Sequence, residues 1–187
     1  MTGFTTSVSQ QDYDAAAAQL GRPPRGMCGV AWRCPCGRPG VVITSPRLPD
    51  GTPFPTTYYL TCRRAVDACS RLEASGLMAA MNVRLAEDAD LRARYLAAHR
   101  SYLADRASLA ARLAVDDIPK HDDSAGGMPD RVKCLHALVG HALAAGPGVN
   151  PLGDEALAAI GEFWREPCLD GQSTPVEPVE TSRTETT

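Results

Sequence analysis

The sequence predicts an α+β fold in which a small antiparallel three-stranded meander packs against five or six helices. Three short runs rich in β-branched and aromatic residues, GVAWRC, GVVITS and TTYYL, follow one another between residues 29 and 60. Gly- and Pro-rich segments separate them, as expected for turns and ordered connections. Most of the remaining chain has apolar residues at helical spacing with capping residues at the ends. A length of 187 residues with 44% hydrophobic residues suits one domain with one core.

Helices are predicted on both sides of the strands. Ser9 begins the first one and Gly21 stops it, while Pro129 suits the first turn of a later helix and Asp154 starts the last. In chain order we expect helices at about residues 12–20, 62–75, 77–86, 88–113, 129–145 and 154–164. We expect a single domain over residues 9–169, with disordered ends at residues 1–8 and 170–187.

The charge distribution excludes some classes of partner. The formal net charge is −3, and residues 170–187 alone contribute −3, from four acidic residues and one arginine. The rest of the chain is therefore neutral, which argues against broad nucleic-acid binding. No apolar run approaches the roughly 20 residues of a membrane span. The N-terminus lacks the pattern of a signal peptide, so we expect a cytoplasmic protein.

The cysteines indicate a metal site. In a reducing cytosol, clustered Cys and His more often bind metal or take part in catalysis than form disulfides. In a meander the ends of the first and third strands fall on the same edge of the sheet, so Cys34 and Cys62 are expected there together. Cys134 and His136 join them if the helix of residues 129–145 starts at that edge. Thiolate and imidazole are zinc ligands, so we predict a zinc site of Cys34, Cys62, Cys134 and His136.

The spacing leaves alternatives open. Cys134 and His136 diverge on a regular helix, so they share a metal only if the first turn is irregular. Cys36 and His141 are the substitute ligands. An iron–sulfur cluster is a variant of the same idea, with the ligands Cys34, Cys36, Cys62 and Cys134. The competing interpretation is that these cysteines are small buried hydrophobic residues.

An anion site is predicted at the start of the same helix. Gly126 and Gly127 precede it, and Arg131 and Lys133 follow. Free N–H groups at a helix N-terminus attract anions, and an arginine holds a phosphate or carboxylate with two parallel hydrogen bonds. The alternative is a flexible loop with a surface Arg and Lys.

No residue is marked as catalytic, and His99 and His141 are the candidates for acid–base work. His99, Tyr102 and Arg106 lie on one face of the long helix. They form either a polar cluster facing a pocket or a flank in which the tyrosine packs while the histidine and arginine are solvated.

Two long motifs, PRLPDGTPFPTTYYLTC and GGMPDRVKCLHALVGHALAAGPGVNPLGDEAL, resemble a bacterial, mainly actinobacterial, family of uncharacterised proteins, the domain-of-unknown-function family 501. The resemblance covers about residues 12–160 and implies no activity. The family pattern is similar to this chain at Cys34, Cys62, Arg131, Lys133, Cys134, His136 and His141, with His in some members at the Cys62 position. That alternation implies zinc rather than an iron–sulfur cluster. Cys36 is less typical of the family, whereas His99, Tyr102 and Arg106 match an HxxYxxxR stretch.

These patterns support two functions. The first is a regulatory or adaptor domain stapled by zinc, with a pocket for a small anion and an unidentified protein partner. The alternative is a metal-dependent hydrolase acting on a phosphorylated or anionic small molecule, in which one zinc ligand is replaced by water.

Overall fold

The computed structural model describes residues 7–115 and 130–165, and within them it has the predicted α+β arrangement, a three-stranded antiparallel sheet and six helices. Residues 1–6 and 170–187, expected to be disordered, lie outside the described residues. The elements in chain order are α1 (Gln10–Leu20), β1 (Met27–Arg33), β2 (Pro39–Thr44), β3 (Tyr58–Leu60), α2 (Arg63–Ala74), α3 (Leu77–Glu87), α4 (Ala89–Arg112), α5 (Leu135–Ala145) and α6 (Pro151–Ile160).

The sheet is the predicted meander, with the strand order β1–β2–β3. Val42 on the central strand pairs with Val30 of β1 on one side and with Tyr59 of β3 on the other. Every residue of β2 is buried, whereas the two outer strands are only partly covered. A central strand buried along its whole length indicates that both faces of the sheet are covered there.

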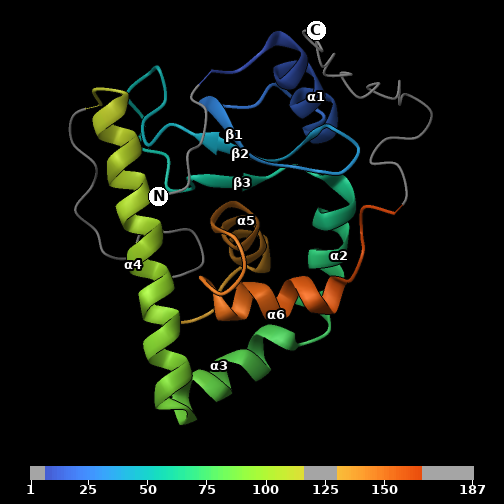
Figure 1. Ribbon diagram of the computed structural model, residues 1–187, viewed down its shortest axis with the longest axis vertical. Coiled ribbons are helices and arrows are strands. Elements are labelled where there is room, and N and C mark those ends of the chain that lie inside the picture. The colour runs from blue at the N-terminus through green and yellow to red at the C-terminus, as the bar shows by residue number, and fades with distance from the viewer. Residues whose placement is uncertain (1–6, 116–129, 166–187) are drawn as a thin grey trace, which may run out of the picture.

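The helix α5 occupies the centre of the molecule. Figure 1 shows it nearly end-on, below β3 and between α2 and α4. It packs against α6, α2 and all three strands. Its sequence LHALVGHALAA is almost entirely apolar, as expected of a helix covered on all sides. A Cβ atom on Gly140 would lie 3.0 Å from the carbonyl oxygen of Tyr58, and one on Gly153 would lie 2.6 Å from that of Leu138. The two glycines therefore set how closely β3 and α6 approach α5.

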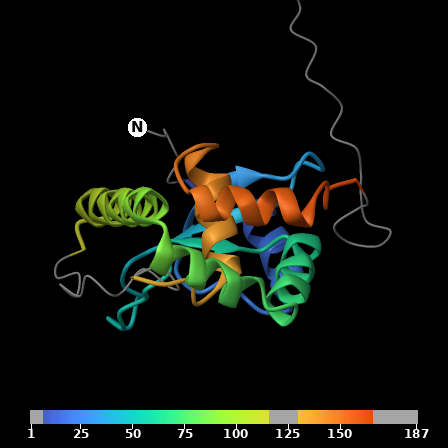
Figure 2. The same ribbon diagram turned by 90° about the horizontal axis from the view of Figure 1, so that it is seen from below.

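The helix α4 runs along one side of the molecule and is seen nearly end-on in Figure 2. It holds the proline-rich connection between β2 and β3 through two side chains. The Tyr102 hydroxyl accepts a hydrogen bond from the Thr57 N–H at 2.6 Å. The Arg106 guanidinium donates to the carbonyl oxygens of Pro55 at 3.0 Å and Pro46 at 3.4 Å. The Pro46 carbonyl oxygen also accepts from the Phe54 N–H at 2.8 Å, so Arg106 adds a second donor there.

His99, Tyr102 and Arg106 of α4 are all buried, so a flank with solvated His99 and Arg106 does not form. Arg106 is 2% exposed and His99 is 7% exposed. Burial lowers the pKa of Arg106. The carbonyl oxygens of the connection take the place of water around its guanidinium.

The helix α5 begins at Leu135, six residues after the predicted start at Pro129. The segment before it is held extended by side chains of α3 and α4. Asn82 accepts from the Val132 N–H at 2.8 Å and donates to its carbonyl oxygen at 3.0 Å. The Tyr95 hydroxyl donates to the carbonyl oxygen of Arg131 at 3.2 Å. These tertiary hydrogen bonds use backbone groups that a helix would need for itself.

The helix α6 begins at Pro151 rather than at Asp154. Asn150 is its N-cap and accepts a hydrogen bond from the Gly153 N–H at 3.0 Å. Proline is favoured at the first helical position, where its missing N–H costs nothing. Asp154 instead accepts from the Gly148 N–H in the preceding turn. The helix ends at Ile160, before Trp164, because Gly161 adopts a positive φ of 64°.

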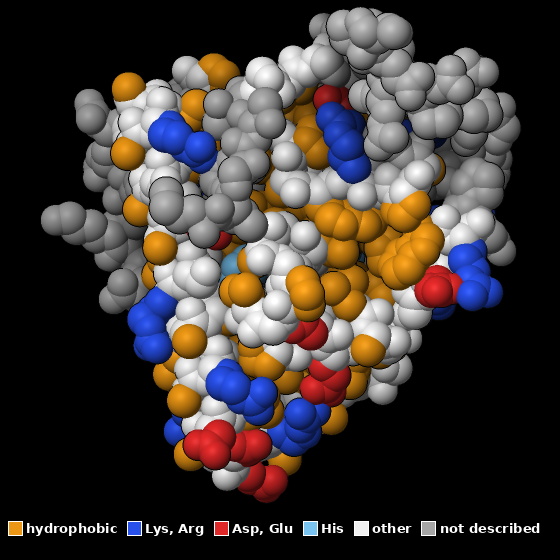
Figure 3. Space-filling view, in the orientation of Figure 1, with side chains coloured by type: hydrophobic (Ala, Val, Ile, Leu, Met, Phe, Trp, Pro, Cys, Tyr) orange, Lys and Arg blue, Asp and Glu red, His pale blue; other side chains and the backbone are white. Residues whose placement is uncertain are grey.

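An aromatic cluster joins β1 to the segment after α6. The ring of Phe163 lies 6.0 Å from that of Trp32 and 4.9 Å from that of Trp164, measured between centroids. Hydrophobic side chains gather on this face of the molecule between α1 and α6 (Figure 3).

None of the helices in residues 7–115 and 130–165 is long and apolar enough to cross a membrane.

Candidate metal centre

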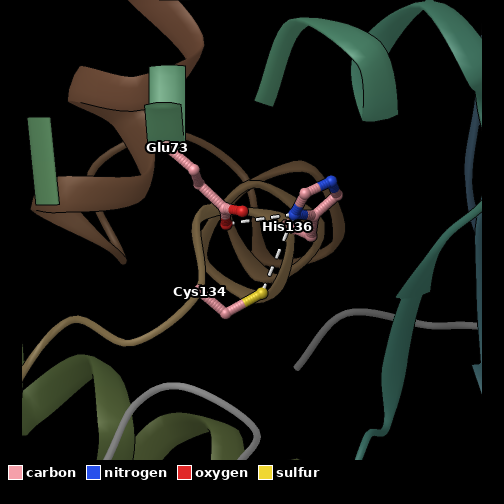
Figure 4. A group of neighbouring side chains, drawn as sticks. All are labelled: Glu73, Cys134 and His136. Atoms are coloured by element: carbon pink, nitrogen blue, oxygen red, sulfur yellow. Dashed lines mark hydrogen bonds and ion pairs between the residues drawn. The ribbon is translucent and has the colours of Figure 1, made fainter. Parts of the chain in front are cut away.

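Three side chains with metal-binding atoms converge at the start of α5. They are Glu73 from the last turn of α2, Cys134 at the N-cap of α5 and His136 in its first turn. One ligand atom from each lies within 4.8 Å of the other two. Figure 4 shows the carboxylate and the thiol both directed at the same edge of the imidazole.

The backbone explains how two residues so close in sequence reach one point. Cys134 has extended dihedral angles, φ −156° and ψ 117°, whereas His136 is already helical. The divergence of i and i+2 positions on a regular helix therefore does not apply. The irregular start required by the Cys134–His136 pair is present, and it follows from the extended segment that Asn82 holds.

Glu73 caps the N-terminus of α5 from a neighbouring helix. Its Oε1 atom accepts a hydrogen bond from the Leu135 N–H at 2.6 Å and lies 3.1 Å from His136 Nδ1. Cys134 at the N-cap provides no side-chain capping hydrogen bond. The positive end of the helix dipole favours the carboxylate, so Glu73 is held in place with or without a metal.

The same imidazole nitrogen faces both other groups. Cys134 Sγ is 3.8 Å from His136 Nδ1, and the second nitrogen, Nε2, lies 3.3 Å from Ser70 Oγ. A Cys–His–carboxylate triad needs the nucleophile on one nitrogen and the carboxylate on the other. Here both groups lie at Nδ1, and the three ligand atoms are close enough together to hold a metal ion. Zinc bonds of about 2.0–2.3 Å put tetrahedral ligand atoms about 3.3–3.8 Å apart, close to the two distances here.

The surroundings of His136 favour positive charge. The hydrogen bond to Cys134 and then the interactions with Glu73 raise the pKa of His136 to about 9, against the opposing effect of burial. A site that stabilises an imidazolium also stabilises a metal cation, which would displace the proton. The side chains of Glu73 and His136 are 25% and 27% exposed, so an ion can enter from solvent.

The donor set suits zinc. One thiolate, one imidazole and one carboxylate are all zinc ligands, and Ser70 would hold the ring as an outer partner. A single thiolate does not suit an iron–sulfur cluster, which is held by several cysteines.

Glu73 was not a candidate from sequence. It lies 61 residues before Cys134, and no local spacing marks it. Only the packing of α2 against α5 brings it to the site.

Cys34 and Cys62 are both beside Gly40 at one edge of the sheet. The Cys62 N–H donates to the Gly40 carbonyl oxygen at 3.2 Å, and a Cβ on Gly40 would lie 3.6 Å from the Cys34 nitrogen. The strand β2 runs between them, so their backbones are separated by two strand spacings, about 10 Å. Both side chains are buried in the core, and neither belongs to the Glu73 group. Their participation in a metal site stays a prediction.

The substitute ligands lie elsewhere. Cys36 is exposed in the turn between β1 and β2. His141 is fully buried, stacks on Tyr58 with 5.8 Å between ring centroids, and has Nδ1 3.3 Å from Asn150 Nδ2. Burial lowers the pKa of His141 to about 4, helped by nearby His99.

The predicted anion residues are described only in part. Gly126 and Gly127 lie outside the described residues. Arg131 and Lys133 are exposed on the extended segment before α5, rather than within its first turn. Arg131 lines an open hollow that Arg92 of α4 also lines. Arg92 is engaged with the carbonyl oxygens that end α3.

A family model described as "Protein of unknown function (DUF501)" matches residues 30–158. No curated protein and no solved structure matches the chain. The matched range contains both strand-edge cysteines, all of α2 to α5, and the Glu73, Cys134 and His136 group.

Proposed function

The chain belongs to the DUF501 family of proteins of unknown function, and we propose that it is a cytoplasmic regulatory or adaptor domain stapled by one zinc ion, with an anion pocket beside the metal. The ion is held by Glu73, Cys134 and His136. The convergence of these three side chains around His136 Nδ1 is the observation that carries the proposal.

The position of the ligands supports a structural role for the ion. Glu73 belongs to α2, whereas Cys134 and His136 belong to the start of α5. An ion bound to all three would join two helices that are 61 residues apart between the nearest ligands. Because α5 is the central helix, fixing its N-terminus would stabilise the packing of the whole domain.

The metal assay is direct. Protein purified without chelator is expected to carry about one equivalent of zinc by elemental analysis. Removing the zinc removes a ligand that binds only the folded state. If the free zinc concentration was 100 times the dissociation constant, the free energy of unfolding falls by about 2.7 kcal/mol. The melting temperature should fall by several degrees, roughly 4 °C or more. Cys134→Ser should lose both metal and the chelator effect.

Cys36→Ser is the matched control, since Cys36 is exposed and outside the group. It should keep the metal and the melting temperature of the wild type. Protein that carries no zinc and takes up none when it is supplied would refute the proposal.

The anion pocket is supported by the placement of two cationic side chains. Arg131 and Lys133 are exposed on either side of buried Val132, next to the N-terminus of α5. We expect inorganic phosphate to bind there and to perturb amide signals of this segment in a heteronuclear NMR titration. Arg131→Ala should weaken the binding, while Arg84→Ala, on the outer side of α3, should not. Equal affinity in both variants would remove the pocket from the proposal.

One observation favours the hydrolase as a second candidate. The three ligands leave a coordination position, and Glu73 and His136 are partly exposed. A zinc-bound water in an open position is the nucleophile of many hydrolases. Zinc-loaded protein would then cleave a phosphate ester such as p-nitrophenyl phosphate, and Cys134→Ser would abolish the cleavage. If the metal-loaded protein does not cleave anionic esters, the hydrolase is excluded and the structural role of the metal remains.

A further inference from the structure

The His136 ring lies along one short stretch of α2. Its Nδ1 atom is 3.1 Å from Glu73, and its Nε2 atom is 3.3 Å from Ser70. Ser70 and Glu73 are three positions apart and therefore neighbours on the surface of the helix. The two nitrogens are thus fixed against successive turns of α2.

Cys69 is the residue beneath this contact. It precedes Ser70 and lies four positions before Glu73, at a separation that puts Cβ atoms about 5–6 Å apart on one helix face. Cys69 is fully buried, so its thiol lies on the core side of the partly exposed Glu73. Cys69 lies on the buried side of α2, and α2 packs against α5, where Cys134 is the N-cap.

The electrostatics agree with this placement. Burial first, and then nearby Glu73 and Cys134, raise the pKa of the Cys69 thiol to about 12. Both Glu73 and Cys134 are therefore near Cys69.

We propose that Cys69 is the fourth ligand of the ion held by Glu73, Cys134 and His136, which closes the site as a four-coordinate structural centre. This inference rests on the proposed metal site. On binding, the Cys69 S–H bond breaks, a Zn–S bond forms, and the proton is released to solvent. Cys69 is not within the 4.8 Å group, so coordination requires its Sγ to move. A change of χ1 rotamer moves a cysteine sulfur by about 3 Å.

A closed centre differs from an open one in what it can do. Two thiolates, one imidazole and one carboxylate fill a tetrahedron, as in structural zinc sites, and leave no position for a reactive water. The inference therefore favours the stapled adaptor over the hydrolase. It also gives Cys69 a reason to be a cysteine within an otherwise apolar helix face.

X-ray absorption at the zinc edge of the full chain tests this by counting sulfur ligands at about 2.3 Å. We expect two sulfurs in the wild type and one in Cys69→Ser. The variant should also bind zinc more weakly, by more than the roughly 10–100-fold that losing an outer partner costs. Cys28→Ser, a half-buried cysteine of β1, is the control and should keep two sulfurs.

The outcomes separate this inference from the proposed function. Wild-type protein that binds no zinc overturns both. Zinc bound through one sulfur keeps the metal site but overturns the role of Cys69. A sulfur count that Cys69→Ser leaves unchanged, with Cys34→Ser or Cys62→Ser reducing it, assigns the second thiolate to the sheet edge and also overturns it.

A variant that fails to fold does not block the test. If the wild-type protein has only one sulfur ligand, that count alone overturns the inference. If the count is two, Cys34→Ser and Cys62→Ser must both leave it at two.

Discussion

Buried His141 should make the protein less stable in mild acid than at neutral pH. It is fully buried on α5, between the rings of Tyr58 and Tyr102. Asn150 fixes its tautomer. The Asn150 side-chain oxygen accepts from the Gly153 N–H, so its Nδ2 faces His141 Nδ1 and donates to it. The Nδ1 atom must be an acceptor, and a proton there would oppose the amide N–H.

The magnitude follows from the pKa of His141, which burial, with a contribution from nearby His99, lowers from the ordinary value of 6.5 to about 4. Between these values the unfolded chain binds the proton and the folded chain does not. The free energy of unfolding therefore falls as pH drops from about 6.5 to about 4, and it is unaffected above that range. At 1.36 kcal/mol per unit, the full loss is roughly 3 kcal/mol.

Urea unfolding at a series of pH values measures the effect. The comparison is with His141→Gln, which keeps an acceptor for Asn150 and cannot titrate. The variant will be less stable near neutral pH, because the ring contacts with Tyr58 and Tyr102 are lost. The wild type should nevertheless lose about 2–3 kcal/mol more than the variant on going from about pH 7 to about pH 4.5. Parallel pH profiles for the two proteins would refute the reasoning.

Three further substitutions test the packing described above. Tyr102→Phe leaves the buried N–H of Thr57 without its acceptor and should cost roughly 1–3 kcal/mol in urea unfolding; a loss below that range would show that another acceptor replaces it. Gly140→Ala puts a methyl group 3.0 Å from a carbonyl oxygen of β3 and should cost roughly 1–3 kcal/mol, whereas an unchanged melting temperature would mean that α5 shifts freely. Arg84→Ala removes an ion pair with Glu155 whose side chains are 48% and 35% exposed, so the free energy of unfolding should change by less than about 1 kcal/mol. A larger loss would contradict the solvent screening expected there.

The fold was predictable because its signals are local. Each strand of the meander is a short run of β-branched or aromatic residues, and several helix ends have a capping or terminating residue such as Ser9, Gly21 or Asp88. The start of α5 could not be predicted in this way. Asn82 and Tyr95, which are at least 36 residues away in the sequence, hold residues 131 and 132 extended. Propensity at Pro129 cannot report such tertiary hydrogen bonds.

The candidate site was predictable only in part: its two residues on one local stretch were, and Glu73 was not. Cys134 and His136 are two positions apart in a distinctive stretch, and sharing a metal required only an irregular helix start. Glu73 stands in an ordinary amphipathic helix, where a glutamate is usually a solvated surface residue. Its function depends on which helix packs beside it, and that is a property of the folded chain.

The order of elements along the chain has a consequence for synthesis. The strand β2, PGVVIT, is buried throughout, yet α5, which packs on the sheet, is made about 90 residues later. A nascent chain that ends within α4 already contains all three strands, but the apolar face of the sheet that α5 covers is still exposed. The long sequence separation of these contacts also slows folding. Ribosome-bound chains truncated before Leu135 should consequently bind chaperones or aggregate, and those extended through α6 should not.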